Sequence, residues 1–327
     1  MNILIANTGF IPVTKYGGTE RVIWYLGKEL VKMGHKVTYL VKKGSYCDFA
    51  TVLFFNPALN INEQIPNHID VVHFNFPPTQ EILKPFIVTL HGNINDERSL
   101  DINTVFVSKN HAERFGSGCF VYNGMDWDDY EKPALNSKKN YFHFLGNAAW
   151  RIKNVKGAIN IIKDTKAEKL KVLGGTRLNL NMGFRFTTST RVTFYGMVGG
   201  AEKYSLLSGS KGLIFPVRWH EPFGLAITES LYFGCPVFGT AYGSLPEIVT
   251  SDVGFLSAQK TALTAAVENA NQFSSKTCHE YALEVFNSKK MAEAYLEKYV
   301  LVLNGKQLNA NQPKLVAIQS EKFLPFE

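Results

Sequence analysis

The stretch that decides the fold is the first forty or so residues. Residues 2–41 read NILIANTGFIPVTKYGGTERVIWYLGKELVKMGHKVTYLV. The apolar run at 2–6 predicts a strand, the apolar positions between 21 and 33 recur at helical spacing, and residues 36–41 predict a second strand. Gly34 stands where helices commonly end. This order predicts a β-α-β unit.

Further strands follow along the chain. Apolar runs at 70–74, 86–92 and 104–108 predict three more, with helix-like connections between them. Continuous apolar strands that alternate with helices are typical of parallel sheets covered on both faces. The first part of the chain is therefore expected to be a Rossmann-like, doubly wound domain.

A polar segment containing a proline, WDDYEKPALNSKKN at 127–140, predicts a domain boundary. A second strand-helix series begins at Tyr141 with YFHFLG. We thus expect an α/β protein with domains at 1–135 and 136–303, and a tail at 304–327 that packs back on the first domain. Two doubly wound domains would place their binding crevices at the carboxyl ends of the strands, facing one interdomain cleft.

Composition limits the classes of function. The 327 residues are 45% hydrophobic and 19% charged, with a net charge of +7. No apolar run reaches the ~20 residues that span a bilayer, and the N-terminal sequence lacks the features of a signal peptide, which favours a cytoplasmic protein. The positive charge suits a phosphorylated ligand or peripheral association with the inner face of an anionic membrane. No motif supports nucleic acid as a partner, and the four separated cysteines predict no zinc ribbon.

Residues 219–230, WHEPFGLAITES, place Glu221 and Glu229 on either side of an apolar stretch. The segment follows the predicted strand GLIFPV and begins a helix near Gly224. The first-turn N–H groups of that helix and its dipole favour an anion. Two buried carboxylates need donors, and the hydroxyls of a ribose and a sugar would supply them.

Four motifs in this order resemble the GT-B retaining glycosyltransferases of family 4. They are YGGTERVIWYLGKELVKMGHKVT at 16–38, VTLHG at 88–92, VYNGMD at 121–126 and EPFGLAITESLYFGCPVFGTAYGSLPEIV at 221–249. The resemblance covers most of residues 1–300. It implies a GT-B fold, in which the first domain binds the acceptor and the second the nucleotide-sugar.

The resemblance also implies roles for individual residues. Glu221 would contact hydroxyls of the donor sugar and Glu229 the ribose. The backbone of Phe223, Gly224 and Leu225 would meet the diphosphate and the sugar.

Other implied donor contacts come from loops that follow strands. His91 of VTLHG would lie beside the transferred sugar. Gly17 and Gly18 of KYGGTE would border the diphosphate or the acceptor, and Gly196 of VTFYGMV would belong to the donor site. KYGGTE is not the G-x-G-x-x-G fingerprint of dinucleotide-binding proteins.

Relatives carry a G-R-x(4)-K-G pattern for the diphosphate, and this chain departs from it in FLGNAAWRIKNVKGAIN, where Asn147 follows Gly146. One alignment assigns the two cations to Arg151 and Lys153, and a competing one uses Lys156. Cations are required because negative charge develops on the leaving diphosphate.

The expected activity is therefore transfer of a sugar from a nucleotide-sugar to a hydroxyl of a glycan, glycolipid or small-molecule acceptor. The resemblance implies retention of the anomeric configuration without metal or other cofactor; the Asp126-x-Asp128 pair is interpreted as part of a structural turn. UDP-sugars are the first expectation for the donor and GDP-mannose the second. The alternatives are a non-catalytic sugar-nucleotide-binding protein and a GT-B epimerase or inverting transferase. The oligomeric state is not predicted.

Overall fold

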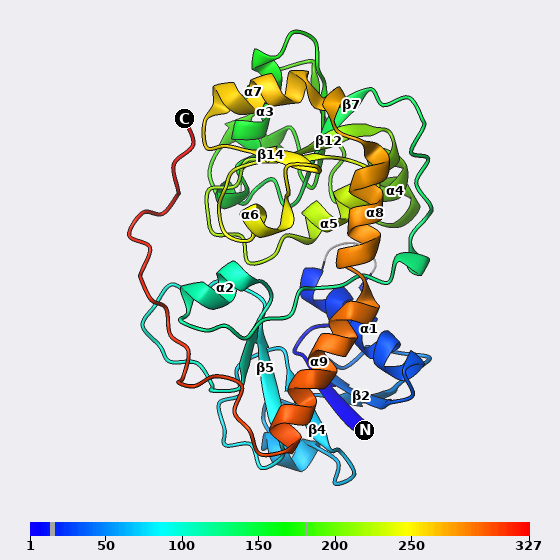
Figure 1. The fold of residues 1–327 in the computed structure, drawn as a ribbon, viewed down its shortest axis with the longest axis vertical. Coiled ribbons are helices and arrows are strands. Elements are labelled where there is room, and N and C mark those ends of the chain that lie inside the picture. The colour runs from blue at the N-terminus through cyan, green and yellow to red at the C-terminus, as the bar shows by residue number, and fades with distance from the viewer. Residues whose placement is uncertain (14–16, 181) are drawn as a thin grey trace. The chain divides into compact units, whose positions relative to one another are not determined.

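The computed structural model describes residues 1–13, 17–180 and 182–327 as two compact units (Figure 1). In the described chain the first unit comprises residues 1–13, 17–127 and 286–319, and the second comprises residues 128–285 and 320–327. The division differs from the domains expected from the sequence in two places: residues 286–303, expected in the second domain, belong to the first unit, and residues 320–327 belong to the second. Residues 304–319 belong to the first unit, as expected.

The first unit is built on a six-stranded sheet of order β3-β2-β1-β4-β5-β6. All of its pairings are parallel. This order is that of a doubly wound Rossmann-like sheet, with the crevice next to the central strands. The strands are β1 (Asn2–Ala6), β2 (Lys36–Val41), β3 (Thr51–Phe54), β4 (Val71–Phe74), β5 (Phe86–Leu90) and β6 (Thr104–Phe106).

Helices α1 (Gly18–Lys32), α2 (Lys109–Arg114) and α9 (Ser288–Leu303) and the 3₁₀ turn η1 (Ile61–Gln64) complete this unit. Helix α9 packs against α1 and β5. Its buried Tyr299 hydroxyl lies 2.8 Å from His73 Nδ1, and its Tyr295 hydroxyl lies 3.0 Å from Thr89 Oγ1. These buried polar contacts explain why α9 belongs with the first sheet although it follows the second in sequence.

The second unit repeats the topology. Its six-stranded parallel sheet has the order β11-β8-β7-β12-β13-β14. When these six strands are numbered along the chain, this is the order 3-2-1-4-5-6, as in the first sheet. The strands are β7 (Tyr141–Leu145), β8 (Leu170–Leu173), β11 (Val192–Phe194), β12 (Ser210–Phe215), β13 (Val237–Gly239) and β14 (Gly254–Leu256). A separate antiparallel ribbon, β9 (Leu178–Asn179) with β10 (Arg185–Phe186), extends from the connection between β8 and β11.

Helices and 3₁₀ turns connect these strands. They are η2 (Trp127–Asp129), η3 (Arg151–Lys153), α3 (Val155–Asp164), α4 (Gly200–Ser208), α5 (Leu225–Tyr232), α6 (Leu245–Ile248), α7 (Lys260–Glu268), η4 (Ala270–Gln272) and α8 (Ser275–Val285). Ile161 and Ile162 of α3 pack with Phe142, Phe144 and other buried residues in the main core of this unit. Within the described residues, no helix is both long and apolar enough to cross a bilayer.

Candidate functional site

The loop between β12 and α5 contacts the GSLPEI segment closely, because Gly243 of that segment has no side chain. Gly224, immediately before α5, has φ +90°, a conformation that glycine adopts readily. A Cβ atom on Gly243 would lie 2.3 Å from both the nitrogen and the carbonyl oxygen of Glu221. Ser244 follows and donates its backbone N–H to the Glu221 carbonyl at 2.9 Å and its hydroxyl to the Phe223 carbonyl at 2.7 Å. The GSLPEI segment thus fixes the backbone that carries Glu221.

Glu221 forms a buried ion pair with Lys153. Their Nζ and Oε2 atoms are 2.5 Å apart, and the side chains are 11% and 6% exposed respectively. The indole N–H of Trp219 donates to the same carboxylate oxygen at 2.9 Å. The ammonium also lies over the rings of Phe215 and Trp219, 5.2 and 4.9 Å from their centroids. The structure thus brings together two residues that the sequence singled out separately.

The turn before α3 places Lys153 there. Asn154 adopts a left-handed conformation, with φ 55°, and its side chain accepts the Gly157 N–H at the start of the helix. Its amide also donates to the Pro216 carbonyl at 2.9 Å, while the Arg218 N–H donates to the Ile152 carbonyl at 2.7 Å. These bonds tie the β7–α3 connection to the loop after β12.

Glu229 forms a second buried pair, on α5. Its Oε1 accepts the Lys203 ammonium at 2.5 Å and the Tyr130 hydroxyl at 2.9 Å. Both charged side chains are almost completely buried. Lys203 and Tyr130 were missed in the sequence; the available signal was a lysine on the inner face of the helix AEKYSLLS. The carboxylate assigned to a ribose therefore also has a structural partner.

Arg151, in the same 3₁₀ turn as Lys153, and Lys156 of α3 border a cavity of the second unit. Both are exposed and line this cavity, of about 680 Å³, together with Arg218. The Arg151 guanidinium lies 4.9 Å from the ring centroid of Phe323. Of the three cations proposed for the diphosphate, Lys153 alone pairs with Glu221 among the ion pairs of the described residues.

Glycines at the ends of three neighbouring strands let loops approach closely. A Cβ on Gly174, after β8, would lie 2.0 Å from the Gly146 carbonyl, after β7. Gly196, after β11, donates its N–H to the Gly175 carbonyl at 3.1 Å. It has φ +68°, and a Cβ on it would meet no atom within 4 Å. The predicted donor residue Gly196 thus borders open space at the carboxyl edge of the sheet.

His91 lies just after β5 in the first unit. Its Nε2 is 2.8 Å from Oδ1 of Asn75, whose own amide nitrogen donates to the Ala6 carbonyl. Because Asn75 presents its oxygen, Nε2 carries the proton and Nδ1 is an acceptor in the neutral ring. Burial lowers the pKa of His91 to about 4, so the ring is neutral near pH 7.

The other residues of the first unit that were singled out in the sequence are Gly17, Gly18 and Asp126. Gly17 immediately precedes α1 and Gly18 is its first residue, whereas Lys15 and Tyr16 of the quoted loop lie outside the described residues. The Asp126 carboxylate accepts the ammonium groups of Lys28 and Lys32, each at 3.0 Å. These contacts explain Asp126 as a structural residue.

The second unit is similar in sequence to known glycosyltransferases. Residues 125–282 match the family model described as glycosyl transferases group 1. The chain is 22% identical to the O-antigen chain mannosyltransferase C of Escherichia coli, over 94% of this chain and all of that protein. It is 26% identical to an uncharacterized 41.2 kDa protein in the cps region of Klebsiella pneumoniae, over 55% of this chain and 54% of that protein, so this match spans about half of each.

Solved structures show the same fold. AviGT4, a glycosyltransferase involved in avilamycin A biosynthesis, matches with a TM-score of 0.72 at 20% identity, over 93% of this chain and 98% of that one. Anabaena Alr3699/HepE, solved with UDP and glucose, matches with a TM-score of 0.65 at 15% identity, over 92% and 99%. Together with the two doubly wound sheets, these similarities identify the GT-B fold.

Proposed function

We propose that this glycosyltransferase, whose residues 125–282 carry the glycosyl transferases group 1 domain, moves a hexose from a nucleotide-sugar to an acceptor hydroxyl with retention of configuration and without a metal. The observation that carries the proposal is the Lys153–Glu221 pair next to the N-terminus of α5. A cation, a carboxylate and a helix N-terminus are the groups that a sugar diphosphate requires.

In the proposed reaction, the bond between the anomeric carbon and the diphosphate oxygen lengthens and negative charge develops on the diphosphate. Lys153 and the first-turn amides of α5 stabilise this charge, because both are positioned before the reaction begins. Glu221 accepts hydroxyls of the sugar and Glu229 those of the ribose. The acceptor oxygen bonds to the anomeric carbon on the same face, and its proton passes to an oxygen of the departing diphosphate.

His91 is proposed to contact the sugar through its unprotonated Nδ1. The Asn75 contact and the lowered pKa support an acceptor that receives a sugar hydroxyl and takes no proton in the reaction. Gly17, Gly18 and Gly196 would border the ligand with backbone alone.

UDP-sugars are the favoured donors, since Alr3699/HepE, which shares the fold, was solved with UDP and glucose. The relationship to an O-antigen mannosyltransferase makes GDP-mannose the second candidate. A surface polysaccharide or its lipid-linked precursor is the proposed acceptor class, and the cytoplasmic face of a membrane the proposed location.

The direct test is thermal unfolding with UDP, GDP, ADP and their hexose conjugates. A ligand at one hundred times its dissociation constant adds about 2.7 kcal/mol to the free energy of unfolding, so the true donor class should raise the Tm selectively. Proton NMR of the product with and without EDTA then reports the anomeric configuration and the metal requirement. An inverted product, or activity lost with EDTA and restored by a metal, would contradict the mechanism. Nucleotide binding without turnover of any donor would favour the non-catalytic alternative.

A further inference from the structure

The β9–β10 ribbon exposes its apolar side chains. Every second residue from 178 to 186 is a large apolar residue that is about half exposed or more. These residues are Leu178, Leu180, Met182, Phe184 and Phe186, exposed by 49, 72, 63, 77 and 58%. We call this set the ribbon patch. Patches of this kind commonly mark interaction sites.

The opposite face of the ribbon carries the charges and packs on the protein. Arg177 donates to the carbonyls of Thr187, Ser189 and Val192. Arg185 donates to the Thr176 carbonyl at 3.0 Å and lies 4.9 Å from the ring centroid of Phe194. An antiparallel ribbon ordinarily buries its apolar face and hydrates its polar one. Here the orientation is reversed, so the protein's own core does not account for the apolar face.

The sequence around the ribbon carries an unusual share of the positive charge. Residues 150–191 contain ten lysines and arginines against two acidic residues, a net charge of +8, while the entire chain has +7. The two acids are already paired: Glu168 with Lys211 and Asp164 with Lys260, each at 2.7 Å. Both of these partners lie outside the segment, and Lys153 pairs with Glu221. The other nine cations of the segment form no ion pair among the residues that the structure describes.

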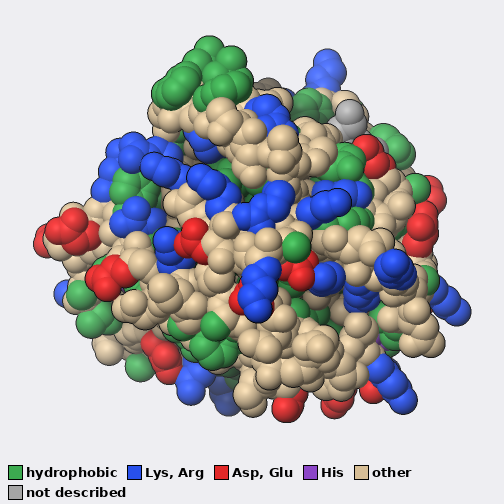
Figure 2. Space-filling model, turned by 90° about the horizontal axis from the view of Figure 1, so that it is seen from above, with side chains coloured by type: hydrophobic (Ala, Val, Ile, Leu, Met, Phe, Trp, Pro, Cys, Tyr) green, Lys and Arg blue, Asp and Glu red, His purple; other side chains and the backbone are tan. Residues whose placement is uncertain are grey.

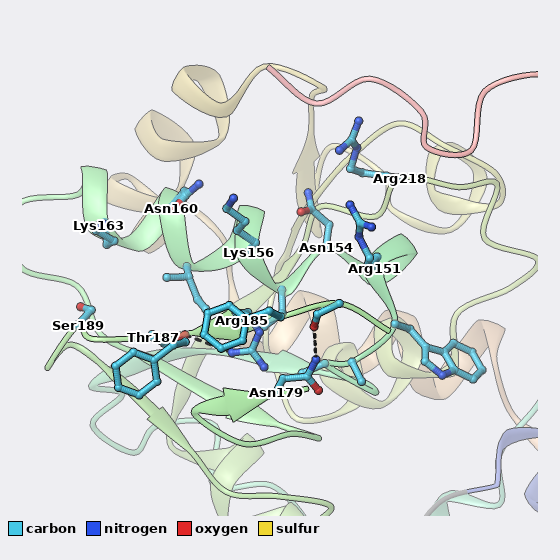
Figure 3. A pocket seen from close by; sticks show the side chains of 18 of the residues that line it. Arg151, Asn154, Lys156, Asn160, Lys163, Asn179, Arg185, Thr187, Ser189 and Arg218 are labelled. Atoms are coloured by element: carbon cyan, nitrogen blue, oxygen red, sulfur yellow. Dashed lines mark hydrogen bonds between the residues drawn. The ribbon is translucent and has the colours of Figure 1, made fainter. Parts of the chain in front are cut away.

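Several of these cations surround a cavity beside the ribbon. Lys156 and Lys163 of α3 line it (Figure 3), and Phe184 and Phe186 are also among its lining residues. Both lysines are exposed, and no ion pair involves either within the described part of the chain. Figure 2 shows exposed hydrophobic side chains next to Lys and Arg on one face. Apolar groups and cations thus occur on the same surface.

We infer that the ribbon patch and the cations of α3 form a docking surface for an anionic lipid bilayer. The apolar side chains would enter the interfacial zone, while the ammonium and guanidinium groups contact lipid phosphates. A second copy of this chain fits less well, because pairing through the ribbon would bring two strongly positive surfaces together. The inference rests on the proposed function in one respect: a bilayer would also hold a lipid-linked acceptor.

The experiment is flotation of the full chain with vesicles of equal parts phosphatidylcholine and phosphatidylglycerol, and with pure phosphatidylcholine. We expect binding to the anionic vesicles only, reduced by salt. The double substitution Leu180→Ser, Phe184→Ser should weaken binding by about tenfold or more, from the apolar surface lost. Lys163→Gln should weaken it about fivefold, from the attraction of one cation to an anionic surface.

The matched control is Leu83→Ser in the first unit, whose side chain is 78% exposed, like that of Phe184. It should leave binding unchanged. Equal vesicle binding by the parent and the ribbon variant, with both folded by circular dichroism, would overturn the inference. So would a parent that forms dimers which the ribbon variant abolishes while neither binds vesicles.

The nucleotide thermal shift, measured on the same proteins, separates the two proposals. A parent that binds vesicles but no nucleotide supports the docking surface and refutes the proposed function. A parent stabilised by a nucleotide that does not bind vesicles refutes the docking surface and leaves the function standing. The ribbon variant should keep the parent's nucleotide shift.

Discussion

Replacing Glu229 by glutamine should destabilise the second unit before any effect on the ligand is considered. The substitution keeps the acceptor for the Tyr130 hydroxyl but removes the carboxylate charge that lies 2.5 Å from the Lys203 ammonium. Both side chains are almost fully buried, 7% and 3% exposed. Removing one member of a buried ion pair costs about 3–5 kcal/mol, because the remaining charge stays desolvated but loses the attraction of its partner.

The double variant Lys203→Met, Glu229→Gln removes both charges and keeps similar volumes. Replacing a buried pair by uncharged groups is often close to neutral, so most of the lost stability should return. The loss of about 3–5 kcal/mol expected for the single variant Glu229→Gln should lower the Tm of the second unit by on the order of 10 °C. Urea unfolding followed by tryptophan fluorescence and circular dichroism measures both effects.

Nucleotide binding by the stable double variant then tests the role of Glu229. If Glu229 holds the ribose, the double variant should bind the donor nucleotide at least about tenfold more weakly, since a hydrogen bond to a charged group contributes about 1.5–3 kcal/mol. If Glu229→Gln is as stable as the parent, the argument that Glu229 and Lys203 form a buried charged pair is wrong. A stable double variant with unchanged nucleotide affinity would refute the ribose contact and leave Glu229 a purely structural residue.

Three further predictions follow from the same geometry. Glu221→Gln should lower kcat by about 100-fold with little change in nucleotide affinity, as expected for a group that acts mainly in the transition state. Steady-state kinetics measures kcat and calorimetry measures the nucleotide affinity. Equal losses in kcat and in affinity would contradict the prediction. Gly243→Ala should disrupt the Glu221 backbone and cost more stability and activity than Gly200→Ala, which has φ +54° but open space around a Cβ; equal effects in urea unfolding and rate assays would count against this. Burial lowers the pKa of both His73 and His143 to about 3, so below pH ~6.5 the unfolded chain binds protons that the native chain does not. Each histidine should therefore lower the free energy of unfolding by about 2 kcal/mol between about pH 7 and pH 5. Urea titrations that show no such loss in either unit would refute this prediction.

The fold could be predicted because its signals are local. The first strand, Asn2–Ala6, and the second, Lys36–Val41, have the bounds that apolar runs indicate. The edge strands β3 and β14 and the ribbon were not predicted, because most of their residues lie outside the core and no buried apolar run marks them. The assignment of α9 to the first unit depends on its contacts with β5 and α1, which are remote in sequence.

The candidate site was predictable where one segment supplies the chemistry. Glu221 and Glu229 lie in the same motif, so the position of Glu221 before a helix and of Glu229 within it could be predicted from the sequence. Their partners could not. Lys153 reaches Glu221 through a left-handed turn at Asn154, and Lys203 reaches Glu229 from a different helix, so both pairings depend on the tertiary structure.

The place of α9 in the first unit has a consequence for synthesis on the ribosome. The second unit lies largely in one continuous stretch, 128–285, and can close its sheet as soon as that stretch has emerged. The first unit emerges earlier, yet the tyrosines that meet His73 and Thr89 arrive only with residues 288–303. The first unit therefore cannot complete its core until residues 288–303 have emerged. The second unit, although it is synthesised later, can fold before the first unit is complete.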